Sequence, residues 1–224
     1  MKRLILCFAL LAACGGGNGA LSFSVSTKTA SATSRALAVA SNINVQRVRI
    51  NVGRLKLEGP GSGAASRDAG DDRDGGDDDE NEIEVRQGPF LIDLDAAALN
   101  GVVTKVFDAD VPPGTYREFK LDIFPGASLQ NASVVVDGTV GTSPFTFTSS
   151  LTAQQKKEGS FVVGGSSANI TLSIDPRSWF GTASAQLDPT VAANRTQIEN
   201  NIRSSLDVFQ DDDGEGHENH HRDH

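Results

Sequence analysis

The stretch INVQRVRINVGRLKL at residues 43–57 constrains the fold more than any other part of this sequence. Apolar residues alternate with polar ones in short runs, and the phase of the alternation slips at Arg47 and again near Gly53. A repeat of two residues is typical of a β-strand, whereas the faces of a helix repeat every 3.6 residues. The stretch therefore predicts one long strand that is interrupted by one or two β-bulges.

Shorter runs of the same kind follow along the chain, separated by turn signals such as Pro112-Pro113-Gly114 and Asp137-Gly138. Many short strands at near-regular spacing favour an antiparallel β-sandwich or barrel. We therefore expect a mainly β protein: an antiparallel β-sandwich with a C-terminal α-helix. The other expected strands are an edge strand at 21–25 and strands at 82–86, 89–94, 102–108, 115–124, 132–137, 144–148, 160–164 and 168–174.

Helix signals are few. Residues 95–100 before Gly101 and residues 151–158 before Gly159 each predict one or two turns that end at a glycine. The strongest signal is Asp188-Pro189, an N-cap followed by a proline at the first helical position, and it predicts a helix over 188–210. The apolar residues at helical spacing that would dock this helix on the sandwich are Val191, Ile198, Ile202, Leu206 and Phe209.

The net charge of −9 is concentrated in two blocks. Residues 68–84 contribute −9 and residues 211–224 contribute −5, so the rest of the chain is mildly basic. Blocks of like charge usually remain solvated and disordered. A chain with a net negative charge and no stripe of basic residues binds the phosphate backbone of nucleic acids poorly, so we expect no nucleic-acid partner.

The N-terminus has the pattern of an export signal. Lys2 and Arg3 precede a ten-residue apolar run at 4–13, which is too short to span a bilayer but has the length of a signal-peptide core. The run ends in Leu11-Ala12-Ala13-Cys14, which resembles the lipobox of bacterial lipoproteins. The resemblance implies cleavage before Cys14, a lipid on Cys14 as the membrane anchor, and a place in the bacterial cell envelope. The resemblance also implies the outer membrane, because Gly15 stands where an Asp would favour retention in the inner membrane. The alternative is a plain secretory leader cut after an Ala-x-Ala-like site.

These signals divide the chain into parts. The expected parts are a signal peptide (1–13), a flexible tether (14–35), a β-sandwich domain (36–187) with an acidic loop (68–84), a helix (188–210) and a disordered tail rich in His and Asp (211–224).

The order of motifs also resembles a family of bacterial secreted lipoprotein domains of unknown function. The resemblance rests on the Leu-Ile-Asp-Leu strand at 91–94 and on the turn Pro112-Pro113-Gly114-Thr115-Tyr116, and it covers about residues 36–175. It implies a transthyretin-like or immunoglobulin-like sandwich at the cell surface. These motifs are structural, so the resemblance implies no particular activity.

Two segments are candidates for metal binding. The acidic loop is rich in oxygen ligands of the kind that Ca²⁺ takes, although Gly70 and Asn81 stand where an EF-hand needs acids. The tail contains all four histidines of the chain, and imidazoles bind Zn²⁺, Ni²⁺ or Cu²⁺. The alternative for both segments is a solvated segment without a preformed site. The candidate ligands are Asp72, Asp74, Asp77 and Asp79 for Ca²⁺ and His217, His220, His221 and His224 for Zn²⁺.

No catalytic pattern stands out in the sequence. There is no Gly-x-Ser-x-Gly motif, and every His lies in the tail, so a Ser-His-Asp triad has no placed base. Trp179 and Phe180 fit either a platform for stacking sugars or, more often in aromatic-poor chains, a core plug. The carboxylates that a glycosidase pair would draw on are Asp93, Asp95, Glu118 and Asp122, and nothing singles out two of them.

We therefore expect a cell-envelope lipoprotein with a non-enzymatic structural or ligand-binding β-sandwich and no required cofactor. The alternatives are an envelope metal-binding protein, through the tail and the acidic loop, and a carbohydrate-binding module. The expected partners are the membrane, through the lipid anchor, and a protein or glycan that the sequence does not identify.

Overall fold

The computed structural model describes residues 19–28, 42–59, 83–164, 168–182, 185–216 and 218. Within these residues the chain is mainly β, as predicted, and a short helix lies near its C-terminal end. The strands are β1 (Gly19–Thr27), β2 (Ile43–Gly59), β3 (Ile83–Gln87), β4 (Phe90–Leu94), β5 (Thr104–Val111), β6 (Gly114–Ile123), β7 (Val134–Val140), β8 (Ser143–Ser149), β9 (Ala153–Val163), β10 (Ala168–Ile174), β11 (Gly181–Thr182), β12 (Ala185–Gln186) and β13 (Asp207–Gln210). The helices are α2 (Pro176–Trp179) and α3 (Arg195–Ser205), with 3₁₀ turns at Ala98–Asn100, Ala127–Leu129 and Ala192–Asn194.

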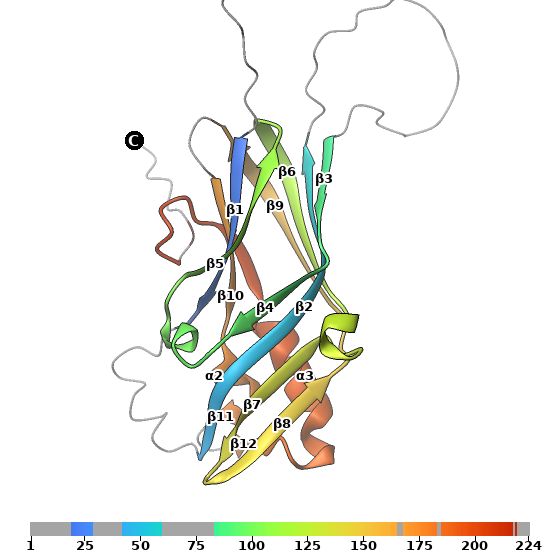
Figure 1. The fold of residues 1–224 in the computed structure, drawn as a ribbon, viewed down its shortest axis with the longest axis vertical. Helices are drawn as coiled ribbons and strands as arrows, with labels where there is room; N and C mark the ends of the chain where they lie inside the picture. The colour runs from blue at the N-terminus through green and yellow to red at the C-terminus, as the bar shows by residue number, and fades with distance from the viewer. Residues whose placement is uncertain are drawn as a thin grey trace, which may run out of the picture.

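The larger sheet is organised around β2, the long strand that the sequence predicted. Its strand order is β8-β7-β2-β6-β9, and β3 and β4 both pair with β2 as well. The first half of β2 lies between β4 and β7, and its second half lies between β3 and β6 (Figure 1). The pairing register shifts between Val45 and Arg47 and between Val52 and Arg54, which confirms the prediction of one or two bulges and shows that there are two.

The change of neighbours along β2 depends on a close approach of two backbones. Gly88, between β3 and β4, has a φ of +122°, a value that favours glycine. A Cβ on Gly88 would lie 2.8 Å from the carbonyl oxygen of Gly53. Glycine at position 88 therefore lets β3 and β4 follow β2 around its bend.

The smaller sheet has the order β13-β10-β1-β5. β1 is parallel to β10 and antiparallel to β5, so it is a central strand and not the predicted edge strand. The predicted tether at 14–35 is accordingly wrong for Gly19–Thr27. The alternation of Leu21, Phe23 and Val25 with serines shows a strand, but it carries no information about which strands lie beside it.

The two sheets enclose one large apolar core. Phe23 of β1 lies 5.5 Å from both Phe90 of β4 and Phe107 of β5, measured between ring centroids. Leu57 of β2 and Phe119 of β6, which pair across the centre of the larger sheet, are fully buried. This arrangement is consistent with the predicted β-sandwich.

Two helix predictions need correction. Residues 153–158 belong to β9 and pair with β6, because the side chains of Lys156 and Glu158 join a row of charges on the face of the larger sheet. The C-terminal helix covers Arg195–Ser205 and not 188–210, because Val191 is extended and Leu206 leaves the helix. Residues 207–210 form β13, so Phe209 lies on a strand.

Candidate functional site

The anchor and metal candidates lie outside the described residues. The described chain starts five positions after Cys14, and it is interrupted between Gly59 and Ile83, where the acidic loop belongs. The candidate residues outside the described ranges are Cys14, Asp72, Asp74, Asp77, Asp79, His217, His220, His221 and His224.

Trp179 and Phe180 are part of the core, as the core-plug alternative predicted. Trp179 is fully buried, and its indole Nε1 donates a hydrogen bond to Ser205 Oγ at 2.5 Å. Phe180 packs edge-to-face against Phe145 and Phe147. A sugar platform needs an exposed aromatic face, so this pair is not one.

The four candidate carboxylates each have a structural partner. Asp93 accepts two hydrogen bonds from Arg47, and Asp122 accepts hydrogen bonds from Arg54 and Gln154. Arg47 holds the pKa of Asp93 below its usual value. Asp95 accepts the backbone N–H groups of Ala97 and Ala98 at 3.0 Å, where it starts a turn. A glycosidase acid needs a raised pKa, and Asp93 has the opposite shift.

Glu118 lies in a ladder of charges on the face of the larger sheet. Lys156 Nζ lies 2.6 Å from Glu118 Oε2, and Lys120 forms an ion pair with the same carboxylate. These hydrogen bonds lower the pKa of Glu118 to about 2. The charge ladder consists of a lysine row (Lys56, Lys120, Lys156) and a glutamate row (Glu58, Glu118, Glu158), each crossing β2, β6 and β9 in register.

The outer face of the smaller sheet has a different character, because it is lined with hydroxyl and amide groups. β1 places Ser22, Ser24 and Ser26 on this face, opposite Asn169, Thr171 and Ser173 of β10. Ser24 Oγ donates to Asn169 Oδ1 at 2.9 Å, and Ser22 Oγ donates to Asp108 Oδ1 at 2.6 Å. The Oγ of Ser26 is buried and has no hydrogen-bond partner among the described residues.

The chain returns over this polar face after β13, along Asp211–Gly216, which we call the C-terminal segment. Asp211 is fully buried, and its carboxylate accepts hydrogen bonds from Thr171 Oγ1 at 2.9 Å and from the N–H groups of Glu215 and Gly216 at 3.0 Å. Burial raises the pKa of Asp211. These contacts show that the predicted disordered tail begins too early, since residues 211–216 are part of the fold.

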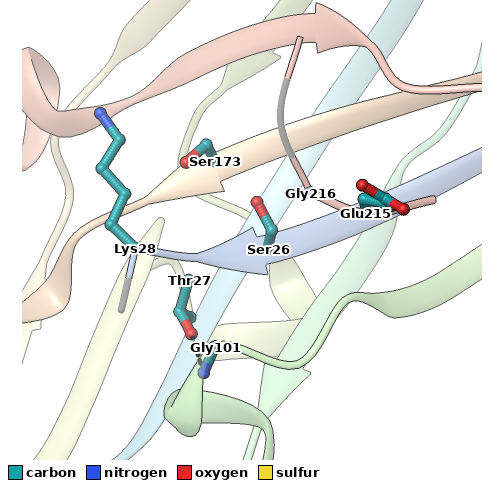
Figure 2. A pocket seen from close by; sticks show the side chains of 7 residues that line it. All are labelled: Ser26, Thr27, Lys28, Gly101, Ser173, Glu215 and Gly216. Atoms are coloured by element: carbon teal, nitrogen blue, oxygen red, sulfur yellow. Dashed lines mark hydrogen bonds between the residues drawn. The ribbon is translucent and has the colours of Figure 1, made fainter. Parts of the chain in front are cut away.

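A hollow of about 330 Å³ lies between the end of β1 and the C-terminal segment (Figure 2). We call it the β1 pocket. Gly216, with a φ of +83°, passes so close that a Cβ on it would lie 3.3 Å from Ser26 Cβ. The backbone N–H of Gly101 donates to Thr27 Oγ1 at 2.9 Å and closes the lower side. The lining residues are Ser26, Thr27, Lys28, Gly101, Ser173, Glu215 and Gly216.

The pocket offers hydroxyl groups, one ammonium group and one carboxylate, and this set can recognise a small polar molecule. It does not suit a metal ion. The nearby Asp211 carboxylate already accepts hydrogen bonds from three protein donors. Among the described residues, no group of three or more His, Cys, Asp or Glu is arranged to hold a metal ion.

A second hollow, of about 370 Å³, lies beside Arg54, Asp122 and Phe124. Its polar groups are satisfied by one another, since Arg54 and Gln154 both donate to Asp122. None of the buried side-chain atoms that lack a hydrogen-bond partner in the described part of the chain belongs to a residue that lines this hollow, so the β1 pocket is the stronger candidate.

The sequence contained one signal for this site, the serines at 22, 24 and 26 that alternate with apolar residues. The sequence predicted an edge strand at 21–25 within a flexible tether and a disordered tail that includes Asp211, so the pocket between these segments was not predicted. Comparisons with protein-family models, with curated proteins and with solved structures found no match to this chain. The resemblance to a secreted lipoprotein family stays a prediction from its motifs. No helix in the described ranges is long and apolar enough to cross a membrane.

Proposed function

We propose that this chain is a lipid-anchored protein of the bacterial cell envelope whose β-sandwich binds a ligand and catalyses no reaction. The lipobox-like Leu11-Ala12-Ala13-Cys14 suggests the anchor, and Gly15 favours the outer membrane. The observation that carries the proposal is the position of β1, which begins at Gly19 and runs through the middle of the smaller sheet.

This position gives the anchor a short reach. Five residue steps separate Cys14 from Gly19, and a fully extended chain spans at most about 18 Å over that length. An acylated Cys14 therefore holds the Gly19 end of the sandwich close to the lipid surface. The linker that the sequence predicted at 14–35 would have allowed a much greater distance.

The two ends of the sandwich can be told apart by the strand pairing. Gly19 pairs with Val111 and lies beside Val163, and Val163 pairs with Gly114. The turn between β7 and β8 lies at the opposite end, the lower end of Figure 1. Ser143, the first residue of β8, pairs with Val140 next to this turn. In the anchored protein the Gly19 end faces the membrane and the Ser143 end faces away from it.

The anchor is tested by replacing Cys14 with Ser. The Cys14→Ser chain should leave the membrane fraction, and mass spectrometry of the native chain should find a lipid on an N-terminal Cys14. Cys7→Ser is the matched control, because Cys7 lies in the expected leader and its loss should leave the protein on the membrane. An unmodified N-terminus, or a Cys14→Ser chain that stays on the membrane, would contradict the anchor.

The orientation is tested with a fluorescent label on one introduced cysteine at each end. Thr115 and Ser143 are exposed, and the mature anchored chain has no other free thiol. In vesicles with nitroxide-labelled lipids, a label at Thr115→Cys should be quenched strongly and a label at Ser143→Cys weakly. Equal quenching at the two ends would contradict the orientation and leave the anchor itself untouched.

A further inference from the structure

We infer that the β1 pocket binds a small zwitterion, a molecule with one carboxylate and one ammonium group and about the size of an amino acid. The inference rests on the proposed ligand-binding function and names the site and the ligand class. Three features of the pocket support it: a buried hydroxyl without a partner, charges of opposite sign on its two sides, and its size.

The first feature is Ser26. Its side chain is buried, it lines the pocket, and its Oγ finds no hydrogen-bond partner among the described residues. The neighbouring serines of β1 both have partners, Asp108 for Ser22 and Asn169 for Ser24. Buried polar groups are normally hydrogen-bonded, so the Ser26 hydroxyl is a group that a ligand would satisfy.

The second feature is the arrangement of charge. Lys28 lies on one side of Ser26 and Glu215 lies on the other (Figure 2). Ser173, the register partner of Ser26 on β10, lies on the Lys28 side of Ser26 in this view. No ion pair joins Lys28 to another residue of the described part of the chain. Glu215 has a contact of its own, but a carboxylate accepts several donors. Lys28 and Ser173 suit a ligand carboxylate, and Glu215 suits a ligand ammonium.

The third feature is the size of the pocket and the way it is bounded. Its volume of about 330 Å³ is at the lower end of the range for ligand sites, which favours a small metabolite over an oligosaccharide or a folded partner. Gly216 limits the pocket further, since a Cβ there would lie 2.9 Å from Val103 Cγ2. Asp211 holds this segment in place through the N–H groups of Glu215 and Gly216.

The ligand class is tested by thermal unfolding of the full chain, purified in detergent, with each of the proteinogenic amino acids added at about 10 mM. A ligand that binds only the folded protein raises its melting temperature. At least one amino acid should do so, and acetate and methylamine, which each carry half of the recognised chemistry, should have no effect. The inference is overturned if no amino acid raises the melting temperature, or if acetate or methylamine alone raises it equally.

Substitutions then locate the site by calorimetry with the amino acid found. Lys28→Met and Glu215→Gln should each weaken binding by at least about tenfold, because each removes a charge-assisted hydrogen bond. Lys105→Met is the matched control, since Lys105 is an exposed lysine of β5 that pairs with Asp108 outside the pocket. Unchanged binding in both pocket variants would place the ligand elsewhere and overturn the inference.

Ser26→Ala separates a binding role from a structural one. The Ser26 hydroxyl has no partner in the described fold, so its removal should leave the stability of the ligand-free protein unchanged or higher. Affinity for the amino acid should fall at the same time. A variant that keeps full affinity contradicts the inference. Because the chain is in detergent, none of these results depends on whether Cys14 is acylated, so a failed anchor and a failed ligand site remain distinguishable.

Discussion

The indole Nε1 of Trp179 donates a hydrogen bond to the Oγ of Ser205, 2.5 Å away, and joins the short helix α2 to the end of α3. The carbonyl oxygen of Trp179 also accepts the side-chain amide of Asn201 at 3.1 Å. Trp179 is fully buried, so both ends of this residue are fixed inside the core. The pair connects the C-terminal region to the sandwich.

Replacing Trp179 with a smaller side chain should therefore destabilise the fold, and the loss should grow with the volume removed. Trp179→Phe loses the hydrogen bond and some volume, and it should lower the free energy of unfolding by about 1–2 kcal/mol. Trp179→Ala leaves a cavity and should lower it by about 3–5 kcal/mol. Denaturation followed by far-UV circular dichroism measures both losses. Tryptophan fluorescence is unsuitable, because Trp179 is the only tryptophan in the sequence and both variants lack it. Val191→Ala, at an exposed position, is the control, and a loss in Trp179→Ala no larger than in this control would contradict the assignment.

The charge ladder should make stability depend on pH in the acid range. The pKa of Glu118 is lowered from 4.5 to about 2 in the folded chain, so its stabilising effect is complete above pH 4.5 and is lost as the pH falls towards 2. Glu118→Gln should lower the free energy of unfolding by about 1 kcal/mol at pH 7 and flatten its decline between pH 4.5 and 2.

Urea titrations at several pH values measure this effect. Glu158→Gln is the matched control, because Glu158 ends the same glutamate row and its side chain is 74% exposed. An equal effect of the two substitutions would show that burial between two lysines does not set the contribution of Glu118.

Asp211 should show the opposite dependence on pH. Burial raises its pKa above the usual value of 3.8, so the stabilisation from protonated Asp211 is complete below pH 3.8 and is lost as the pH rises through the raised pKa. Asp211→Asn loses an acceptor for the C-terminal segment and should cost about 1–3 kcal/mol. The cost relative to the native chain should be larger near pH 3 than at pH 7. Asp110→Asn, at an exposed position of β5, is the control, and a cost that does not change with pH would contradict the prediction.

The hypothesis that the tail binds metal is tested by a chain that ends at Gly216. This chain keeps the contacts of Asp211 and loses all four histidines, so its melting temperature should match that of the full chain. If the histidines hold Zn²⁺, calorimetry should find weaker Zn²⁺ uptake in the shorter chain. Equal uptake would contradict a role for the histidines. A chain that ends at Gln210 is unsuitable, because it also removes Asp211.

Much of the larger sheet could be predicted from the sequence, because the alternation of apolar and polar residues is local. The phase slips at Arg47 and near Gly53 predicted one or two bulges in β2, and register shifts lie at both positions. Phe119, Leu121 and Ile123 stand at every second position of the strand predicted at 115–124, and all three are buried. A shift of one residue in the pairing register would turn the apolar side chains of a strand to the solvent face. The apolar pattern of the sequence therefore indicates which side chains of this strand are buried.

The sequence by itself thus determined the strand class, the bulges and the core positions of individual strands. Only the tertiary structure decided which distant segments meet. β1 lies beside β10 although Ser24 and Asn169 are 145 positions apart, and residues 153–158 form a strand because β6 offers charged partners in register. The β1 pocket depends on four such segments: the end of β1, the turn at Gly101, β10, and the C-terminal segment around Gly216. Pairing between remote strands depends on the cost of closing long loops and on packing in the assembled core, and a local repeat carries no information on either.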